Sequence, residues 1–262
     1  SGAKSTTAPD EPEKPQRTGR ILCSGADKDI FAGTFGGRSV AICVSRLGGG
    51  GWRRIQNEIK VFQAVGSHPH IIEMYSSGLE KGSLYMVLEV VEPIGFDLDR
   101  LKNTYSFAGQ TVPSSLMARL YRQLVDALGH MHQKSLIHMD LKTENVLIDS
   151  KHDAKLIDMG IARRIGTKEC LRAGYLAPEL CEGTKPLGVK VDSWGLGLIL
   201  HQIYQSQWKI LTDDGPVKML DGRPSSQRPM EKAVREAMVG LLRFSPPQRW
   251  HLKDLAACDW LQ

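Results

Sequence analysis

Long hydrophobic runs are missing from this chain of 262 residues. No stretch reaches the roughly 18 consecutive apolar residues that a membrane-spanning helix requires, so we expect no membrane span. A signal peptide is also missing from the start of the sequence. Because Ser1-Gly2 resembles a cloning remnant, two locations stay open. One is a soluble protein of the cytoplasm, and the other is a protein trimmed from a precursor bound for a secretory or vacuolar compartment.

Cysteine is scarce as well. The chain has five cysteines, too few for a fold that is held together by disulfides. Cys170 and Cys181 flank one loop and would be able to pair in an oxidising compartment. We nevertheless expect all five to be free thiols.

The chain also lacks a strong excess of either positive or negative charge. The net charge is +5, and the lysines and arginines are scattered along the chain. Such scatter is typical of a solvated surface rather than of a nucleic-acid-binding face. We therefore expect a protein substrate or protein partner and no nucleic acid, while the oligomeric state stays unknown.

The composition predicts an ordinary soluble domain, with 41% hydrophobic and 24% charged residues. Residues 1–19 are rich in Lys, Glu, Pro, Thr and Ser, which predicts a disordered tail. Residues 20–92 read as short strands with one helix, and Gly48–Gly51 within them is either a native run or an engineered loop. Residues 93–262 read as mainly helical. The chain is long enough for two lobes that share a cleft, so we expect an α+β fold with a small antiparallel sheet plus one helix and a larger helical lobe.

The clearest local signals are a glycine pair and a helical spacing. Gly36-Gly37 separates two runs typical of strands, KDIFAGTF and RSVAICVSR, and favours a tight hairpin turn. Pro113 with Ser114 or Ser115 at the N-cap predicts the start of a helix. Apolar residues recur along that helix at three- and four-residue spacing and predict its buried face, namely Met117, Leu120, Leu124, Leu128 and Met131.

The strongest chemical signal is the run IHMDLKTENVLID followed by AKLIDMG. This pattern resembles the catalytic loop and the magnesium motif of protein kinases. Phosphoryl transfer needs a carboxylate that orients the attacking hydroxyl, a cation on the transferring phosphate and oxygen ligands for Mg²⁺. The resemblance implies that Asp140 orients the hydroxyl, Lys142 contacts the phosphate, and Asn145 and Asp158 bind Mg²⁺.

Flanking residues fit the same family over about residues 20–262. The resemblance implies that Glu179 of the LAPEL run pairs with Arg249, that Asp192 begins the central helix of the large lobe, and that Leu88 is the gatekeeper. It also implies an ATP site formed by Gly25, Lys28, Ile30, Ala41, Glu58, Glu89 and Val91. Taken alone, Glu58 would be a solvated helix charge and Asp192 a helix cap.

Five positions depart from the family pattern. The strand lysine is Cys43, and the glycine-rich loop keeps only its middle glycine, Gly25. Met139 replaces the arginine of His-Arg-Asp, and Met159 replaces the phenylalanine of Asp-Phe-Gly. Arg172 replaces a threonine of the activation segment. The lost lysine bears most directly on activity, since it normally holds the phosphates of the nucleotide.

Lys28 is a candidate for that lost charge. A turn at Gly36-Gly37 places Cys43 opposite Ile30 and Lys28 opposite Ser45, so Lys28 and Cys43 share one face of the sheet. Such diagonal neighbours lie about 7–8 Å apart, within reach of a lysine side chain. The with-no-lysine kinases have the same arrangement, and this chain resembles them at both positions.

Three functions stay open at this point. The first is an atypical protein serine/threonine kinase that uses ATP and Mg²⁺, a specificity that Lys142 within LKTEN favours. The second is a pseudokinase that serves as a scaffold, in which Lys28 is only an exposed loop charge and Asp27 and Asp29 repel phosphates. Degenerate secreted kinases of apicomplexan parasites also lack parts of the glycine loop. The third function is a switch that binds ATP without turnover.

Overall fold

The computed structural model describes residues 14–46, 50–169, 176–183, 186–204 and 231–262. Its contacts divide the chain into two compact units, Ser1–Gln56 with Met74–Val90 and Asn57–Glu73 with Val91–Gln262. The strands are β1 (Gln16–Ser24), β2 (Lys28–Phe35), β3 (Arg38–Ser45), β4 (Met74–Glu80), β5 (Ser83–Glu89), β6 (Leu136–Ile137), β7 (Val146–Ile148), β8 (Ala154–Leu156) and β9 (Arg163–Arg164). The helices are α1 (Gly51–Val65), α2 (Leu98–Phe107), α3 (Ser114–Gln133), η1 (Thr143–Asn145), α4 (Pro178–Glu182), α5 (Lys190–Tyr204), α7 (Lys232–Leu241) and α8 (Leu252–Ala256).

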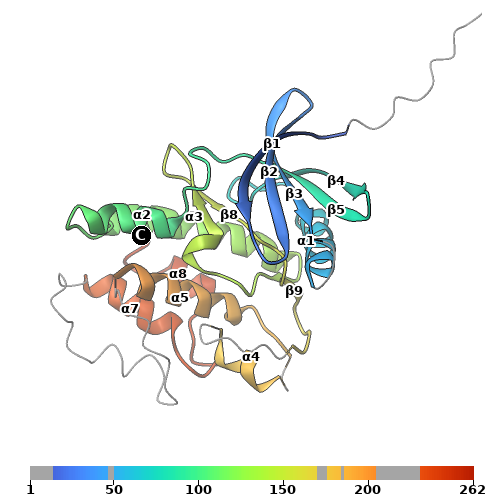
Figure 1. Ribbon diagram of the computed structural model, residues 1–262. Helices are drawn as coiled ribbons and strands as arrows, with labels where there is room; N and C mark the ends of the chain where they lie inside the picture. The colour runs from blue at the N-terminus through green and yellow to red at the C-terminus, as the bar shows by residue number, and fades with distance from the viewer. Residues whose placement is uncertain (1–13, 47–49, 170–175, 184–185, 205–230) are drawn as a thin grey trace, which may run out of the picture. The chain divides into compact units, whose positions relative to one another are not determined.

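The first unit contains a five-stranded antiparallel sheet in the order β1-β2-β3-β5-β4 (Figure 1). Gly36 and Gly37 connect β2 to β3 with φ angles of 58° and 70°, which residues with a side chain rarely adopt. The two positive φ angles match the twist of the flanking strands. The register has Lys28 opposite Ser45 and Ile30 opposite Cys43, so the predicted hairpin and its pairing are confirmed.

The first strand begins earlier than the sequence indicated. β1 starts at Gln16, inside the segment expected to be a disordered tail, and its first residues pair with Gly33 and Thr34 of β2. These polar residues give no hydrophobic alternation, but an exposed strand is also stabilised by its ladder of backbone hydrogen bonds. The expectation of disorder was therefore wrong for Gln16–Gly19, and residues 1–13 lie outside the described residues.

Alternation along β3 gives the sheet two distinct faces. Val40 and Ile42 pack with Val87 of β5 in a cluster that also takes in Phe35, Val44, Tyr75 and Tyr85. Cys43 points to the opposite face and is also buried, with 1% of its surface exposed. Because both faces of β3 are covered, the central strand is held in one register.

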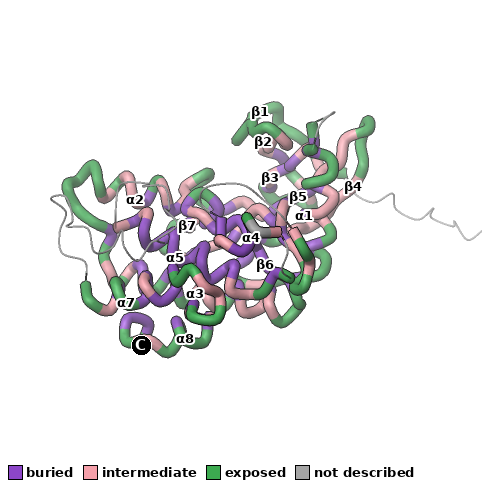
Figure 2. Tube along the Cα trace, turned by 90° about the horizontal axis from the view of Figure 1, so that it is seen from below, coloured by how far each residue is buried: buried purple, intermediate pink, exposed green. Residues whose placement is uncertain are grey.

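The second unit is mainly helical and is organised around α3 and α5. The five apolar residues predicted to form one face of α3 are all fully buried, and twelve of the fifteen residues of α5 are buried (Figure 2). One detail of α3 was wrong. Its N-cap is Pro113, and neither serine caps the helix. The hydroxyl of Ser114 instead donates to Glu231 at 2.9 Å.

Two short antiparallel pairs of strands carry the polar loops of this unit. β7 and β8 form the hairpin between the two kinase-like motifs, and β6 pairs with β9. None of the helices in the described ranges is long and apolar enough to cross a membrane.

Candidate active site

The loop between β6 and β7 brings three of the predicted residues together. Asp140 is almost buried, and its Oδ2 atom accepts hydrogen bonds from Lys142 Nζ at 2.8 Å and from Asn145 Nδ2 at 3.0 Å. Asn145 Nδ2 also donates to the backbone carbonyl of Asp140 at 2.8 Å. Asp140, Lys142 and Asn145 therefore form one bonded cluster.

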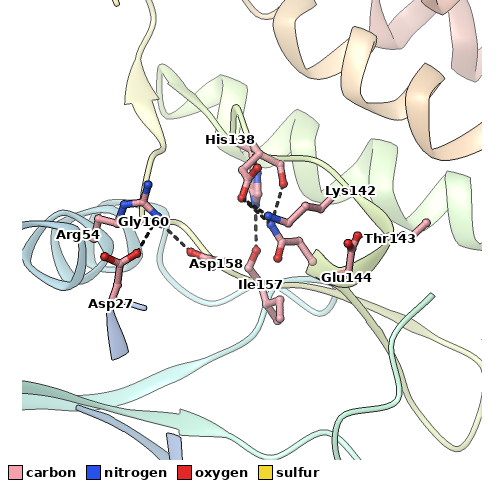
Figure 3. A network of polar contacts seen from close by, with 11 residues as sticks. Asp27, Arg54, His138, Lys142, Thr143, Glu144, Ile157, Asp158 and Gly160 are labelled. Atoms are coloured by element: carbon pink, nitrogen blue, oxygen red, sulfur yellow. Dashed lines mark hydrogen bonds and ion pairs between the residues drawn. The ribbon is translucent and has the colours of Figure 1, made fainter. Parts of the chain in front are cut away.

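His138 links this loop to the segment that carries Asp158. Its Nδ1 atom accepts from the backbone N–H of Asp140 at 3.2 Å, and its Nε2 atom lies 3.0 Å from the carbonyl oxygen of Ile157 (Figure 3). A neutral ring that carries its proton on Nε2 satisfies both contacts. Because Ile157 directly precedes Asp158, this ring fixes the spacing between the two motifs.

Asp192, near the start of α5, supports the catalytic loop through hydrogen bonds. Its carboxylate accepts from the backbone N–H groups of His138 and Met139, at 3.0 and 2.9 Å, and from His132 Nε2 at 2.8 Å. Burial by itself raises the pKa of Asp192, but His132, His138 and the backbone N–H of Met139 together lower it more, so the pKa lies below its ordinary value. Asp192 is thus a buried anchor of the catalytic loop. His132 was not predicted, because it lies far from Asp192 along the chain.

Asp158 has the left-handed backbone conformation, with φ 63°. Its Oδ1 atom accepts from the backbone N–H of Gly160 at 3.2 Å, and this short-range bond holds the turn. Asn57 of α1 adds support that was not predicted, because its Nδ2 atom lies 3.1 to 3.2 Å from the carbonyl oxygens of Met159, Gly160 and Ala162. Its position next to Glu58 was the only available signal.

The predicted pairing of Glu179 with Arg249 is confirmed. The two guanidinium NH groups donate to the two carboxylate oxygens at 2.6 and 2.9 Å. Arg249 also donates to the carbonyl oxygens of Arg243, Phe244 and Lys190. A bidentate pair with further hydrogen bonds is the geometry in which a buried arginine is stable.

The strand positions predicted for nucleotide binding lie in the first unit. Lys28 is half-buried at the start of β2, diagonal to Cys43 on the same face. Ala41 lies in the middle of β3, between Ala32 and the buried Leu88. Cys43 therefore leaves a neutral, buried side chain at the position of the family lysine, and Lys28 is the cation on the neighbouring strand of that face.

The β1–β2 turn contains Gly25. Its backbone N–H donates to the carbonyl oxygen of Lys28 at 3.0 Å and closes the turn. A Cβ atom at Gly25 would meet only that oxygen, at 3.5 Å, which is an ordinary contact. The fold itself therefore does not require glycine here.

The remaining predicted residues lie close, along the chain, to the positions where the sequence passes from one unit to the other. Glu89 is the last residue of β5 and pairs with Val40, and Val91 follows as the first residue of the second unit and is buried. Glu58 of α1 is 2% exposed, which contradicts a solvated helix charge, because a buried carboxylate needs a partner or a proton. Met139 and Met159 are both buried, as apolar replacements should be.

Two predicted positions of the activation segment and part of one glycine run lie outside the described residues. Arg172 lies outside the described residues, and so does Cys170, whose pairing with Cys181 is therefore not addressed. The same holds for part of Gly48–Gly51.

Comparison with known proteins shows which family the chain belongs to. The family model of the protein kinase domain matches residues 40–261. The chain is 32% identical over 187 residues to the serine/threonine-protein kinase nekl-2 of Caenorhabditis elegans, covering 67% of this chain and 51% of that protein. It is 30% identical over 217 residues to the mouse testis-specific serine/threonine-protein kinase 5, covering 79% of this chain and 58% of the relative.

A third relative is the zebrafish serine/threonine-protein kinase Nek8, which is 31% identical over 214 residues, 77% of this chain and 30% of that protein. The chain thus spans between about a third and three fifths of the length of these relatives. The similarity concerns the kinase domain and not the remainder of those proteins.

Proposed function

This chain belongs to the protein kinase family, and from that premise we propose that it is an active, atypical serine/threonine kinase. It transfers the γ-phosphate of ATP to a hydroxyl group of a protein. The observation that carries this proposal is the bonded cluster of Asp140, Lys142 and Asn145. A scaffold needs a stable fold, but it has no need for a carboxylate, a cation and an amide that converge at this spacing.

Asp140 is suited to orient the attacking hydroxyl. Its carboxylate is held by two donors, and its backbone N–H is bonded to His138. A carboxylate fixed in this way presents an acceptor to an incoming hydroxyl without having to reorganise. Lys142 is half-buried beside it, where its ammonium group is able to balance negative charge on a transferring phosphate.

The donor set fits Mg²⁺ that is bound together with phosphates. Asn145 donates to Asp140 through its Nδ2 atom, so its Oδ1 atom is the oxygen proposed to bind the ion. Asp158 would add a carboxylate. Among the described residues no group of three or more His, Cys, Asp or Glu side chains is arranged as a metal cage. One or two protein oxygens completed by phosphates and water are the ligands that Mg²⁺ prefers in such sites. When bound, Mg²⁺ would neutralise charge on the phosphates, and Asn145 and Asp158 would hold it.

Lys28 is the proposed phosphate-binding cation of the first unit. Its diagonal position beside Cys43 supports this role, and the buried Glu58 is proposed as its counter-charge, as in the family pattern. Gly25, Ile30, Ala41, Glu89 and Val91 are proposed to form the rest of the nucleotide site. The tolerance of the fold for a side chain at Gly25 favours a functional reason for glycine there, namely close approach of phosphates to the backbone.

A pseudokinase is the alternative, and the neutral Cys43 favours it. The two readings separate in a thermal-shift titration with Mg-ATP followed by a phosphate-transfer assay. At 100 times its dissociation constant, Mg-ATP should stabilise the parent chain by about 2.7 kcal/mol, a rise of several degrees. Lys28→Ala should abolish most of this rise. Lys60→Ala, which removes an exposed lysine from α1, is the matched control.

Asp140→Asn should keep the thermal shift and lose at least 100-fold in the rate of transfer, because it leaves nucleotide binding in place and removes the orienting carboxylate. A parent chain that shifts without any transfer would identify an ATP-binding switch. No shift in the parent chain would identify a scaffold.

A further inference from the structure

Two carboxylates flank the proposed phosphate-binding lysine, Asp27 on one side and Asp29 on the other. Negative charge beside a phosphate site lowers affinity for a nucleotide, unless it is compensated. The structure supplies a compensating arginine for each carboxylate, and all residues of this arrangement belong to the first unit.

Arg46 compensates Asp29 from the end of β3. Its Nε atom donates to Asp29 Oδ2 at 3.2 Å, and its NH2 group donates to Asp29 Oδ1 at 2.8 Å and to Ser24 Oγ at 2.7 Å. The hydrogen bond from Arg46 lowers the pKa of Asp29, and Ser24 lowers it further. Since side chains alternate along β2, this ion pair lies on the face opposite Lys28.

Arg54 compensates Asp27 from the first turns of α1. Its NH1 group lies 2.9 Å from Asp27 Oδ2 (Figure 3). The backbone of Asp27 is fixed as well, because its carbonyl oxygen accepts from the N–H of Arg46 at 3.0 Å. Gly51, the first residue of α1, lies so close that a Cβ atom there would be 2.3 Å from the same oxygen. The turn is thus held from β3 and from α1.

We infer that Arg46 and Arg54 are positioning residues for nucleotide binding, which hold the β1–β2 turn in place and cancel its two carboxylate charges so that Lys28 presents the net positive charge to the phosphates. This inference rests on the proposed function. In the family pattern, glycines let the loop close over phosphates by flexibility. Here most of those glycines are missing, and a turn preordered by ion pairs takes over the task, since a fixed turn loses less entropy on binding.

The test measures dissociation constants for Mg-ATP and for adenosine by calorimetry. Arg46→Gln and Arg54→Gln should each weaken Mg-ATP binding roughly fivefold, because each leaves an uncompensated negative charge on a residue adjacent to Lys28 in the chain. Binding of adenosine, which has no phosphates, should stay within twofold. Arg53→Gln removes an exposed arginine from the same helix and should change neither constant. Equal weakening for both ligands would overturn the inference, because it would indicate general damage to the sheet.

A double variant tests the electrostatic part. Asp29→Asn combined with Arg46→Gln removes both charges of the pair, so Mg-ATP affinity should recover to within about twofold of the parent. Failure to recover would mean that Arg46 acts on the nucleotide directly, and the compensating role would be wrong.

Hydrogen exchange of the backbone N–H of Gly25 tests the turn without any nucleotide. Arg46→Gln and Arg54→Gln should exchange this proton about tenfold faster than the parent chain and Arg53→Gln. A parent chain that fails to bind Mg-ATP would refute the proposed function and, with it, the nucleotide role of the arginines. The exchange rates would still decide whether they hold the turn. Unchanged exchange in both variants would refute the holding role, whatever the parent chain binds.

Discussion

The β1–β2 turn and the catalytic loop each surround one functional side chain with charged and polar neighbours, but they hold these groups differently. In the turn, Arg46 and Asp29 keep 44% and 27% of their side-chain surface exposed. Beneath the catalytic loop, Asp192 of α5 is fully buried and accepts hydrogen bonds from two backbone N–H groups of that loop. Exposed ion pairs are screened by water and salt, whereas buried ones are screened much less.

This difference has a consequence for how each region tolerates change. A buried carboxylate whose donors are removed loses its solvation and its partners together, which destabilises the whole unit. An exposed pair that is broken exchanges its partner for water at little cost. Substitutions of buried groups in the second unit should therefore mainly lower the free energy of unfolding. Substitutions at the turn should mainly lower the affinity for the ligand.

The largest loss of stability is expected for Arg249→Met. This change leaves Glu179 buried without its partner and removes the donor of three backbone carbonyl groups, so the free energy of unfolding should fall by about 4 kcal/mol. Urea denaturation measures it. The double variant Arg249→Met with Glu179→Leu should recover part of the loss, because no charge is then left buried. A single variant within 1 kcal/mol of the parent chain would contradict the contrast between the regions.

Asp192→Asn should cost somewhat less, about 3 kcal/mol. The amide keeps one acceptor oxygen, but its NH₂ group faces the donors of His132 and the catalytic loop. Urea denaturation again gives the free energy. Asp259→Asn near the C-terminus, which changes an exposed aspartate, is the control and should lie within 0.5 kcal/mol of the parent chain. Equal effects of the two substitutions would show that Asp192 is not an anchor.

A smaller and pH-dependent effect is expected at His68, in the loop after α1. Burial lowers the pKa of His68 below its ordinary 6.5, and the neighbouring His130 and His70 lower it further against the opposing effect of Asp126. Because the pKa of His68 is lower in the folded than in the unfolded chain, the folded state binds protons less readily. The fold therefore has its full stability above pH 6.5 and loses stability as the pH falls below 6.5 through the lowered pKa. Urea midpoints should therefore fall between pH 7 and pH 5.5.

His68→Gln should flatten this decline, because the titrating ring is gone. His152→Asn, which replaces an exposed histidine in a left-handed turn that asparagine also tolerates, should leave the slope unchanged. An unaltered slope in His68→Gln would rule out His68 as its source.

The smallest effect is expected for Arg17→Gln in β1. Its ion pair with Glu80 is exposed on both sides, with 34% and 52% of the side-chain surfaces accessible, so its loss should change the free energy of unfolding by less than about 0.5 kcal/mol. Thermal unfolding at low and high salt provides the measurement. A loss of 2 kcal/mol or more would remove the distinction between exposed pairs in the first unit and buried pairs in the second.

Local patterns predicted the regular elements well. The glycine pair predicted the hairpin and its register, and the spacing of apolar residues predicted the buried face of α3. The resemblance to kinases also predicted the Glu179–Arg249 pair. Signals of this kind succeed because a turn or one helix face depends on residues that are neighbours in the chain.

Contacts between distant segments were missed for the opposite reason. Asn57 bonds to carbonyl groups about a hundred positions further along the chain, and His132 to Asp192. The edge strand from Gln16 was missed because backbone pairing with β2, and not side-chain alternation, stabilises it. No spacing in the sequence reports such partners.

The sequence by itself determined which reactive groups are present and in what order, from Lys28 and Gly25 to Asp140, Lys142, Asn145 and Asp158. Only the tertiary structure decided how charges are balanced. In the sequence, Asp27 and Asp29 count against phosphate binding, yet in the structure each faces an arginine from another element. The physical reason is that the energy of a charge depends on the distance to its partners and on burial, and the fold sets both.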